Sequence, residues 1–250
     1  GSNNLTSAGI SSNYELGVLL KRTGDTEGAF SDFLAYFDSL TGLPNREHFR
    51  RALEEGLAAC DERSEKAALL FIDLDGFKGI NDAHGHLAGD RALVQVRDIL
   101  HSSCRQSDTI IRWGGDEFMV IGNTASPHTV EQLAERIRAN LAGHRFALGN
   151  GHVGRLSGSI GFAMYPFAPS SSRSLHWEQV VAVADHAAYT AKKNGRNAWL
   201  GVYGTRKSSW EELARTNINL PALAQQQVVN LRSSLPRLEE YVEKTVQEQA

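Results

Sequence analysis

The hairpin at the centre of this protein is predicted by Thr109-Ile110-Ile111-Arg112-Trp113-Gly114-Gly115-Asp116-Glu117-Phe118-Met119-Val120-Ile121. Two short apolar segments flank a turn with two glycines, and this pattern is typical of antiparallel strands joined by a tight connection. Upstream, residues 67–72 form a continuous apolar run that ends at Asp73, as expected of a strand buried on both faces. A buried strand together with a hairpin favours a mixed α+β sheet over a strictly alternating parallel sheet.

Helical periodicity surrounds these strands. Helices are predicted by Phe49, Leu53 and Leu57 behind a capping Asn45, by Leu93, Val96 and Leu100, by Val130, Leu133, Ile137 and Leu141, and over residues 177–193. Further strands are expected at residues 156–164 and 198–202, and the Gly- and His-rich residues 143–155 are expected to form a loop. The predicted fold class is therefore α+β, with a central mixed, largely antiparallel sheet flanked by helices.

The domain organisation follows from where this dense patterning begins and ends. Residues 1–37 are expected to be a disordered start and a helical lead-in that resembles a single tetratricopeptide-like hairpin. The patterned domain is expected over residues 38–204. Residues 205–250 are expected to form a helical tail, interrupted at Pro221 and Pro236, that packs on the domain or on a second subunit through Leu231, Leu235, Leu238 and Val242.

The bulk composition excludes several classes of protein. The chain has 250 residues, of which 41% are hydrophobic, enough for one substantial core with appended structure. A formal net charge of −3 provides no basic field, so no nucleic-acid partner is expected. No apolar run approaches the roughly 20 residues that span a bilayer, so no membrane segment is expected. Cys60 and Cys104 lie far apart and indicate reduced thiols in a cytoplasmic protein, or in the soluble part of a longer one.

Acidic residues collect where the predicted strands end. Asp73 and Asp75 follow the buried strand, and Asp116 lies at the hairpin turn. Neighbouring strand ends in one sheet can bring Asp73 and Asp116 to the same ions, and such oxygen ligands suit Mg²⁺. The glycines at 114 and 115 leave room for a bulky nucleotide to approach the backbone. Taken alone, either segment fits better with an ordinary turn whose acids face solvent.

The segment Gly114-Gly115-Asp116-Glu117-Phe118 is the signature that names the GGDEF family of diguanylate cyclases, and this sequence resembles that family from Asp38 to about Val202. Further matching blocks, in the family's order, are Asp38-Ser39-Leu40-Thr41-Gly42-Leu43-Pro44-Asn45-Arg46, Asp73-Leu74-Asp75-Gly76-Phe77-Lys78, Asn81-Asp82, Gly85-His86, Gly89-Asp90, Arg112-Trp113, Ser159-Ile160-Gly161, Tyr189, Ala191-Lys192 and Gly195-Arg196-Asn197. One short motif is weak, whereas many blocks in order are a strong indication. The resemblance implies a nucleotidyl-cyclase- and polymerase-palm-like fold. It also implies an enzyme that condenses two GTP molecules into cyclic di-GMP and pyrophosphate.

The resemblance assigns a metal site to the acidic segments. It implies two divalent ions, Mg²⁺ or Mn²⁺, held by Asp73, the carbonyl of Leu74, Asp116 and Glu117. In-line attack of a 3′-hydroxyl on the α-phosphorus is then stabilised by both ions. Asp73, Asp116 and Glu117 are the expected catalytic residues, and Glu117 can ligate a metal, help to deprotonate the hydroxyl, or do both.

Guanine recognition is implied in the same way. Asn81 and Asp90 match the residues that read the guanine edge, and a carboxylate can accept from the guanine N1 and N2 hydrogens, a pair that adenine lacks. The backbone of Phe77 and Lys78 matches the loop at the terminal phosphates, beside the two glycines of the signature.

The resemblance also implies two cations for the β- and γ-phosphates. These are Lys192 and Arg196, which lie four residues apart and are expected on one face of a helix. An ordinary solvated helix end is the alternative interpretation of the same residues.

Product inhibition and dimerisation complete the expectations. Arg105 and Asp108, three residues apart, match the family's inhibitory site for cyclic di-GMP, with Arg136 as a third candidate. A guanidinium can fork onto guanine or phosphate, whereas without the resemblance this pair would be an ordinary surface ion pair. The family implies a homodimer, since each subunit binds one GTP and two sites face each other across a two-fold axis.

Other functions stay open alongside this one. A domain of this kind can sense GTP or cyclic di-GMP without catalysis, although its signature is then usually damaged, and here both acids and both glycines are intact. Asp73-Leu74-Asp75 also fits the Asp-x-Asp motif of metal-dependent glycosyltransferases, a pattern that is common by chance. A P-loop enzyme is disfavoured because the sequence has no Gly-x-x-x-x-Gly-Lys-Ser/Thr segment.

Overall fold

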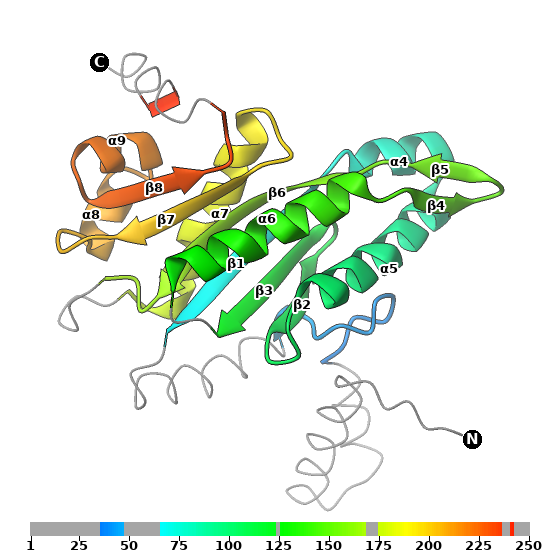
Figure 1. Ribbon diagram of the computed structural model, residues 1–250, viewed down its shortest axis with the longest axis horizontal. Coiled ribbons are helices and arrows are strands. Elements are labelled where there is room, and N and C mark those ends of the chain that lie inside the picture. Colours follow the sequence, from blue (N-terminus) through cyan, green and yellow to red (C-terminus); the bar gives the residue numbers. More distant parts are fainter. Residues whose placement is uncertain (1–35, 48–65, 124–125, 169–174, 237–240, 243–250) are drawn as a thin grey trace, which may run out of the picture.

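The computed structural model describes residues 36–47, 66–123, 126–168, 175–236 and 241–242 (Figure 1). Its elements are β1 (Ala67–Asp75), α4 (Phe77–His84), α5 (His86–Ser103), β2 (Thr109–Gly114), β3 (Glu117–Asn123), α6 (Pro127–Gly143), β4 (Phe146–Gly149), β5 (His152–Gly154), β6 (Ser157–Tyr165), α7 (Trp177–Lys193), β7 (Trp199–Gly204), α8 (Trp210–Arg215), α9 (Leu220–Gln225) and β8 (Val229–Ser233). The predicted lead-in and the helix expected from Phe49, Leu53 and Leu57 lie outside these residues. No helix among them is both long and apolar enough to cross a bilayer.

The main sheet has the strand order β2-β3-β1-β6-β7-β8. All neighbouring strands are antiparallel except β6 and β7, which are parallel. The predicted α+β class with a mixed, largely antiparallel sheet is therefore confirmed. The central strand β1 pairs with β3 and β6 along its two edges, and a core covers each of its faces, which explains its uninterrupted apolar sequence.

Successive side chains of β1 enter two separate cores. Leu69 and Phe71 pack in one core with residues of α7, α8 and α9, whereas Leu70 and Ile72 pack in the other with residues of α5 and α6. Helix α6 and helix α5 thus cover one face of the sheet and α7 covers the opposite face (Figure 1). The strand ends that carry the acidic residues are held between these layers.

Helix α7 lies unusually close to β6. A Cβ atom added to Gly161 would lie 2.0 Å from the carbonyl oxygen of Ala184 and 2.2 Å from the amide nitrogen of Ala188. Only glycine permits this approach of helix and strand, since the obstructing atoms belong to the backbone. The approach fixes the middle of α7 next to the sheet.

The prediction of a helical tail is wrong for residues 229–233. These residues form β8, which pairs antiparallel to β7 from Leu200↔Ser233 to Gly204↔Val229 and extends the main sheet. Helices α8 and α9 precede it, and Pro221 lies in the first turn of α9, where a missing N–H costs nothing. Leu235 is buried and Leu231 is partly buried against the core, so this part of the tail packs on the domain. Leu238 lies outside the described residues.

The loop expected over residues 143–155 is also wrong in part. It contains the hairpin β4–β5, with Phe146 and Leu148 buried. Side chains of α5 hold its backbone, because Arg91 donates to the Leu148 carbonyl at 2.8 Å and Gln95 donates to the Ala147 carbonyl at 2.9 Å. The apolar alternation is too short to distinguish from a loop in the sequence.

Candidate functional site

The acidic segments meet at one edge of the sheet. In the antiparallel pairing of β1 with β3, Asp73 lies opposite Glu117, and the amide of Leu74 donates to the carbonyl of Asp116 at 3.2 Å. Because β3 runs antiparallel to β1, the residues of β3 that directly follow the hairpin turn lie beside the last residues of β1. The structure therefore brings together the acidic residues that the sequence pattern predicted to meet.

The charges at this edge repel one another. Burial raises the pKa of Asp73, and the charges of Asp116 and Asp75 raise it further, whereas Lys192 lowers it. Burial likewise raises the pKa of Glu117, with contributions from the charges of Asp73, Asp185 and Asp116. Asp185, on α7, was not singled out from the sequence, because its proximity to Glu117 depends on how α7 packs. The net effect is an excess of negative charge.

Lys192, in the last turn of α7, partly balances this excess. Its ammonium donates to Oδ1 of Asp73 at 2.6 Å. The sequence suggested a phosphate contact for Lys192, and in the described structure its partner is Asp73.

The donor set fits a divalent cation. Its carboxylates are hard oxygen ligands of the kind that Mg²⁺ and Mn²⁺ prefer. Burial raises the pKa of Asp73 and of Glu117, and neighbouring carboxylates raise both further, as expected where a bound cation would offset negative charge. Among the residues that the structure describes, no three His, Cys, Asp or Glu side chains already surround a common point. Asp73, the Leu74 carbonyl, Asp116 and Glu117 are the groups at this edge that could hold such ions.

The predicted helical face shared by Lys192 and Arg196 is wrong. Helix α7 ends at Lys193, and the chain then turns through Gly195, Arg196 and Asn197 with φ values of 120°, 60° and 46°. Gly195 is the sequence signal for this end, since glycine readily takes positive φ after a helix. Arg196 is exposed on the turn rather than aligned with Lys192 along the helix.

Asp75 binds this turn, a role that the sequence did not indicate. It is only 5% exposed, and its carboxylate accepts from the hydroxyl groups of Ser157 and Ser159, each at 2.8 Å. It also accepts from the amide of Asn197 at 3.0 Å. The acid two residues after Asp73 therefore ties β1 to β6 and to the turn after α7.

The candidate guanine residues lie on α4 and α5. These helices meet at Gly85, which has a φ of 80° and whose amide donates to the Asn81 carbonyl at 2.8 Å. Oδ1 of Asn81 is buried and has no hydrogen-bond partner among the described residues. A Cβ on Gly89 would lie 2.0 Å from this oxygen, so a larger residue there would displace the Asn81 side chain. Asp90 follows Gly89 and is partly exposed.

The remaining substrate candidates lie close to these residues. A Cβ on Gly89 would also lie 3.1 Å from the ring of Phe77, so Phe77 packs beside the Asn81 side chain. Lys78 follows on the same helix and is exposed. Gly114 ends β2 opposite Glu117, and Gly115 and Asp116 form the hairpin turn, where Gly115 has a φ of 40°.

Arg112 supports the hairpin turn, another role that the sequence did not reveal. Its guanidinium donates to the Gly115 carbonyl at 2.9 Å and to Oδ1 of Asp38 at 2.8 Å. Burial opposes ionisation of Asp38, but hydrogen bonds from Thr41 and Arg112 outweigh it and lower its pKa. The start of the family-like segment is thereby bound to the signature.

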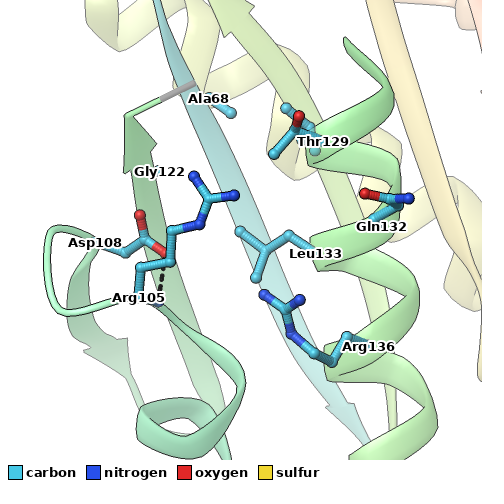
Figure 2. Close-up of a pocket in the computed structure, with 9 residues that line it drawn as sticks. Ala68, Arg105, Asp108, Gly122, Thr129, Gln132, Leu133 and Arg136 are labelled. Carbon is cyan, nitrogen blue, oxygen red and sulfur yellow. Dashed lines mark hydrogen bonds between the residues drawn. The ribbon is translucent and has the colours of Figure 1, made fainter. Parts of the chain in front are cut away.

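The three candidate inhibitory residues line one pocket, which lies between α6 and the segment that links α5 to β2. Figure 2 shows the guanidinium groups of Arg105 and Arg136 entering this space from opposite sides. The Asp108 carboxylate accepts from the Arg105 amide at 2.8 Å, and Arg136 donates to the Ser103 carbonyl at 2.7 Å. Thr129 and Gln132 of α6 also line the pocket. Arg105 is thus not paired with Asp108 through its side chain.

The chain is similar to diguanylate cyclases over its central part. Residues 35–198 match the family described as diguanylate cyclase, GGDEF domain. The bifunctional diguanylate cyclase/cyclic di-GMP phosphodiesterase MucR of Pseudomonas aeruginosa is 37% identical over 166 residues, covering 66% of this chain and 23% of MucR. Diguanylate cyclase DgcS of Shewanella oneidensis is 37% identical over 167 residues, covering 66% of this chain and 52% of DgcS. The chain thus spans only part of these relatives.

Solved structures show the same domain. The GGDEF domain of TpbB (YfiN) from Pseudomonas aeruginosa superimposes with a TM-score of 0.59 at 38% identity, covering 64% of this chain and 91% of that one. The GGDEF domain of DgcB from Caulobacter crescentus, in complex with c-di-GMP, superimposes with a TM-score of 0.60 at 29% identity, covering 67% and 95%. Because the family match extends over well over half of its residues, this protein belongs to the diguanylate cyclase GGDEF domain family.

Proposed function

We propose that the domain is an active diguanylate cyclase, which condenses two GTP molecules into cyclic di-GMP and two pyrophosphates. The observation that carries the proposal is the meeting of Asp73, Asp116 and Glu117 at one sheet edge beside Lys192. The family signature is intact at this edge, and it supplies two of the three carboxylates. Carboxylates that repel one another in this way favour the binding of cationic cofactors.

Two Mg²⁺ or Mn²⁺ ions would be held by Asp73, the Leu74 carbonyl, Asp116 and Glu117. When bound, such ions stabilise the attacking 3′-oxygen and the pyrophosphate leaving group of an in-line displacement at the α-phosphorus. Glu117, whose pKa is raised by burial and by neighbouring carboxylates, is also suited to take up the proton of the attacking hydroxyl.

GTP is the proposed substrate because of the groups on α4 and α5. The buried Oδ1 of Asn81 is an acceptor without a partner in the described structure, and Asp90 adds a carboxylate close by in sequence. Both can accept from the N1 and N2 hydrogens of guanine, which adenine lacks. The phosphates of GTP would lie against Phe77, Lys78 and the glycines of the signature. Lys192 and Arg196 would neutralise the charge of the β- and γ-phosphates.

Catalysis is proposed to need a homodimer, since each domain supplies one bound GTP and the 3′-hydroxyl of one must reach the α-phosphorus of the other. Cyclic di-GMP is the proposed inhibitor at the pocket of Arg105, Asp108 and Arg136. The complex of the DgcB domain with c-di-GMP supports binding of this ligand by the family. The cytoplasmic location expected from the sequence stays a prediction.

The test is incubation of the purified chain with GTP and Mg²⁺ over a range of protein concentrations, with cyclic di-GMP and pyrophosphate quantified. A rate that rises faster than linearly with protein concentration is the expected result for a dimeric site. Tight binding of GTP or cyclic di-GMP without any product would instead identify a sensor. Cleavage of a nucleotide sugar in place of GTP would favour a glycosyltransferase.

A further inference from the structure

We propose that Asp75, Asn197 and Arg138 form a clamp on the turn after α7, and that this clamp positions Arg196 for the terminal phosphates of the substrate. The inference rests on the proposed function, because that function supplies the phosphates. These are positioning residues, since they act through the backbone of the turn. Their contacts connect β1 and α6 to the segment that carries the cation.

The turn itself needs external support. Gly195, Arg196 and Asn197 have φ values of 120°, 60° and 46°, so three consecutive residues have positive φ. Arg196 and Asn197 carry side chains that disfavour this region, although asparagine tolerates it better than most residues. The local bond from the Arg196 amide to the Ala191 carbonyl, at 3.1 Å, is one restraint. Such conformations persist where surrounding contacts hold them.

The first contact of the clamp comes from β1. The buried carboxylate of Asp75 accepts from the Asn197 amide at 3.0 Å. Ser157 and Ser159 of β6 fix that carboxylate through their hydroxyl groups, so it cannot move independently of the sheet. The turn is therefore anchored to the strand end that also carries Asp73.

The second contact comes from α6. Arg138 donates from Nη1 to Oδ1 of Asn197 at 3.0 Å. Its guanidinium is oriented by Glu135, which accepts from Nε at 2.9 Å and also accepts from the indole nitrogen of Trp199 at 3.0 Å. Asn197 is thus held through its backbone by β1 and through its side chain by α6. Loss of either contact should allow Arg196 to move, while Lys192 remains fixed in α7.

The experiment uses Arg138→Ala and Asn197→Gly, because a change at Asp75 would disturb Asp73 directly. Glycine at 197 keeps the backbone conformation accessible and removes the side-chain acceptor, and Arg138→Ala removes the same contact without adding backbone freedom to the turn. Arg215→Ala is the matched control, since Arg215 forms the same i, i+3 pair with Glu212, at 2.7 Å, in α8. Equilibrium binding of GTP is compared with that of GMP, which lacks the β- and γ-phosphates. Steady-state turnover of GTP is measured in parallel.

Both clamp variants should bind GTP up to about fivefold more weakly, because binding must then order a turn that has lost one ordinary hydrogen bond, with GMP affinity unchanged. In turnover the KM for GTP should rise by a similar factor, with kcat less affected. The double variant should be no weaker than either single variant, because both remove the same hydrogen bond. Arg138→Lys, which keeps a donor, should recover part of the affinity.

Several results would overturn the clamp. Equal losses for GTP and GMP would indicate a general disturbance, and variants that match Arg215→Ala in every assay would show that the contacts have no positioning role. If Asn197→Gly fails to fold, Arg138→Ala with its lysine rescue decides the question alone. If the unmodified chain binds GTP but makes no cyclic di-GMP, the proposed function fails, and the comparison of GTP with GMP still tests the clamp.

Discussion

The ammonium of Lys192 lies 2.6 Å from Oδ1 of Asp73, so a cation from the end of α7 contacts the acidic end of β1. This contact lowers the pKa of Asp73, but burial and the charges of Asp116 and Asp75 outweigh it. The negative charge of the carboxylates at this edge therefore exceeds the positive charge that Lys192 supplies. We expect this imbalance to be measurable in the stability of the protein as well as in its activity.

Glu117→Gln should stabilise the protein when divalent ions are removed by a chelator. Because its pKa is raised in the fold, the folded state binds the proton more tightly than the unfolded state does. Stability is then lost as pH rises from the ordinary value of 4.5 through the raised pKa. Glutamine removes this loss, so we expect the melting temperature at pH 7 to rise by about 2–4 °C.

Thermal melts over a pH series check this prediction. The gain should shrink below the ordinary pKa of the acid, where Glu117 is protonated in both states. It should also shrink when Mg²⁺ is added, since ions relieve the same repulsion. An unchanged or lower melting temperature in chelator would show that repulsion does not shape this edge.

Gly89→Ala should weaken GTP binding by about tenfold or more. The new methyl group would lie 2.0 Å from Oδ1 of Asn81, so this side chain would have to move, and its proposed hydrogen bond to guanine would be lost. Gly79→Ala on α4 is the matched control, since nothing lies within 4 Å of its added Cβ. The control should keep its affinity and gain up to about 1 kcal/mol of stability from helix propensity. Titration of both variants with GTP and with ATP measures the affinities. If Gly89→Ala lowers the affinity for GTP and for ATP by the same factor, Asn81 does not belong to the guanine site.

Arg105→Ala should relieve product inhibition without lowering the initial rate. Its guanidinium enters the pocket that Arg136 also lines (Figure 2), and none of the predicted catalytic acids lines this pocket. Loss of a charged hydrogen-bond donor to cyclic di-GMP should weaken inhibition by about tenfold or more. Arg145→Ala, at an exposed position before β4, is the control. Inhibition curves that coincide for the three proteins would return Arg105 to an ordinary surface role.

Gly161→Ala should destabilise the fold by about 1–3 kcal/mol, because the methyl group would collide with the backbone of α7. Gly158→Ala on the same strand should cost less, since its Cβ would meet only side chains, with Cδ1 of Leu141 at 2.9 Å. Urea denaturation measures both. Equal stabilities for the two variants would mean that α7 can move away from β6 at little cost.

The parts of this structure that the sequence predicted are those with strong local patterns. The uninterrupted apolar run before Asp73 predicted β1, and the glycines of the signature predicted the hairpin turn. The acidic edge followed from these two elements, because an antiparallel hairpin beside β1 leaves few other positions for its turn. Asp73 and Asp116 therefore came together as expected.

The parts that the sequence missed depend on contacts between distant residues. β8 has only five residues, too few for an alternating pattern to be recognised, and the helical spacing predicted for the tail shares only Leu231 with it. The turn after α7 interrupts a basic segment that otherwise continues a helical pattern, and its conformation depends on Asp75 and Arg138. The sequence motif predicted that Lys192 contacts the substrate phosphates. A motif of this kind does not reveal that Lys192 pairs with Asp73 in the protein without substrate.

The most direct test of the account is the formation of cyclic di-GMP from GTP and Mg²⁺ by the purified chain and by Asp116→Asn, measured side by side. The unmodified chain should release cyclic di-GMP and pyrophosphate. The variant should melt at a similar temperature and turn over at least about a thousandfold more slowly, because a cation-binding group is lost. No product from the unmodified chain at any protein concentration, or equal rates for the two proteins, would contradict the account.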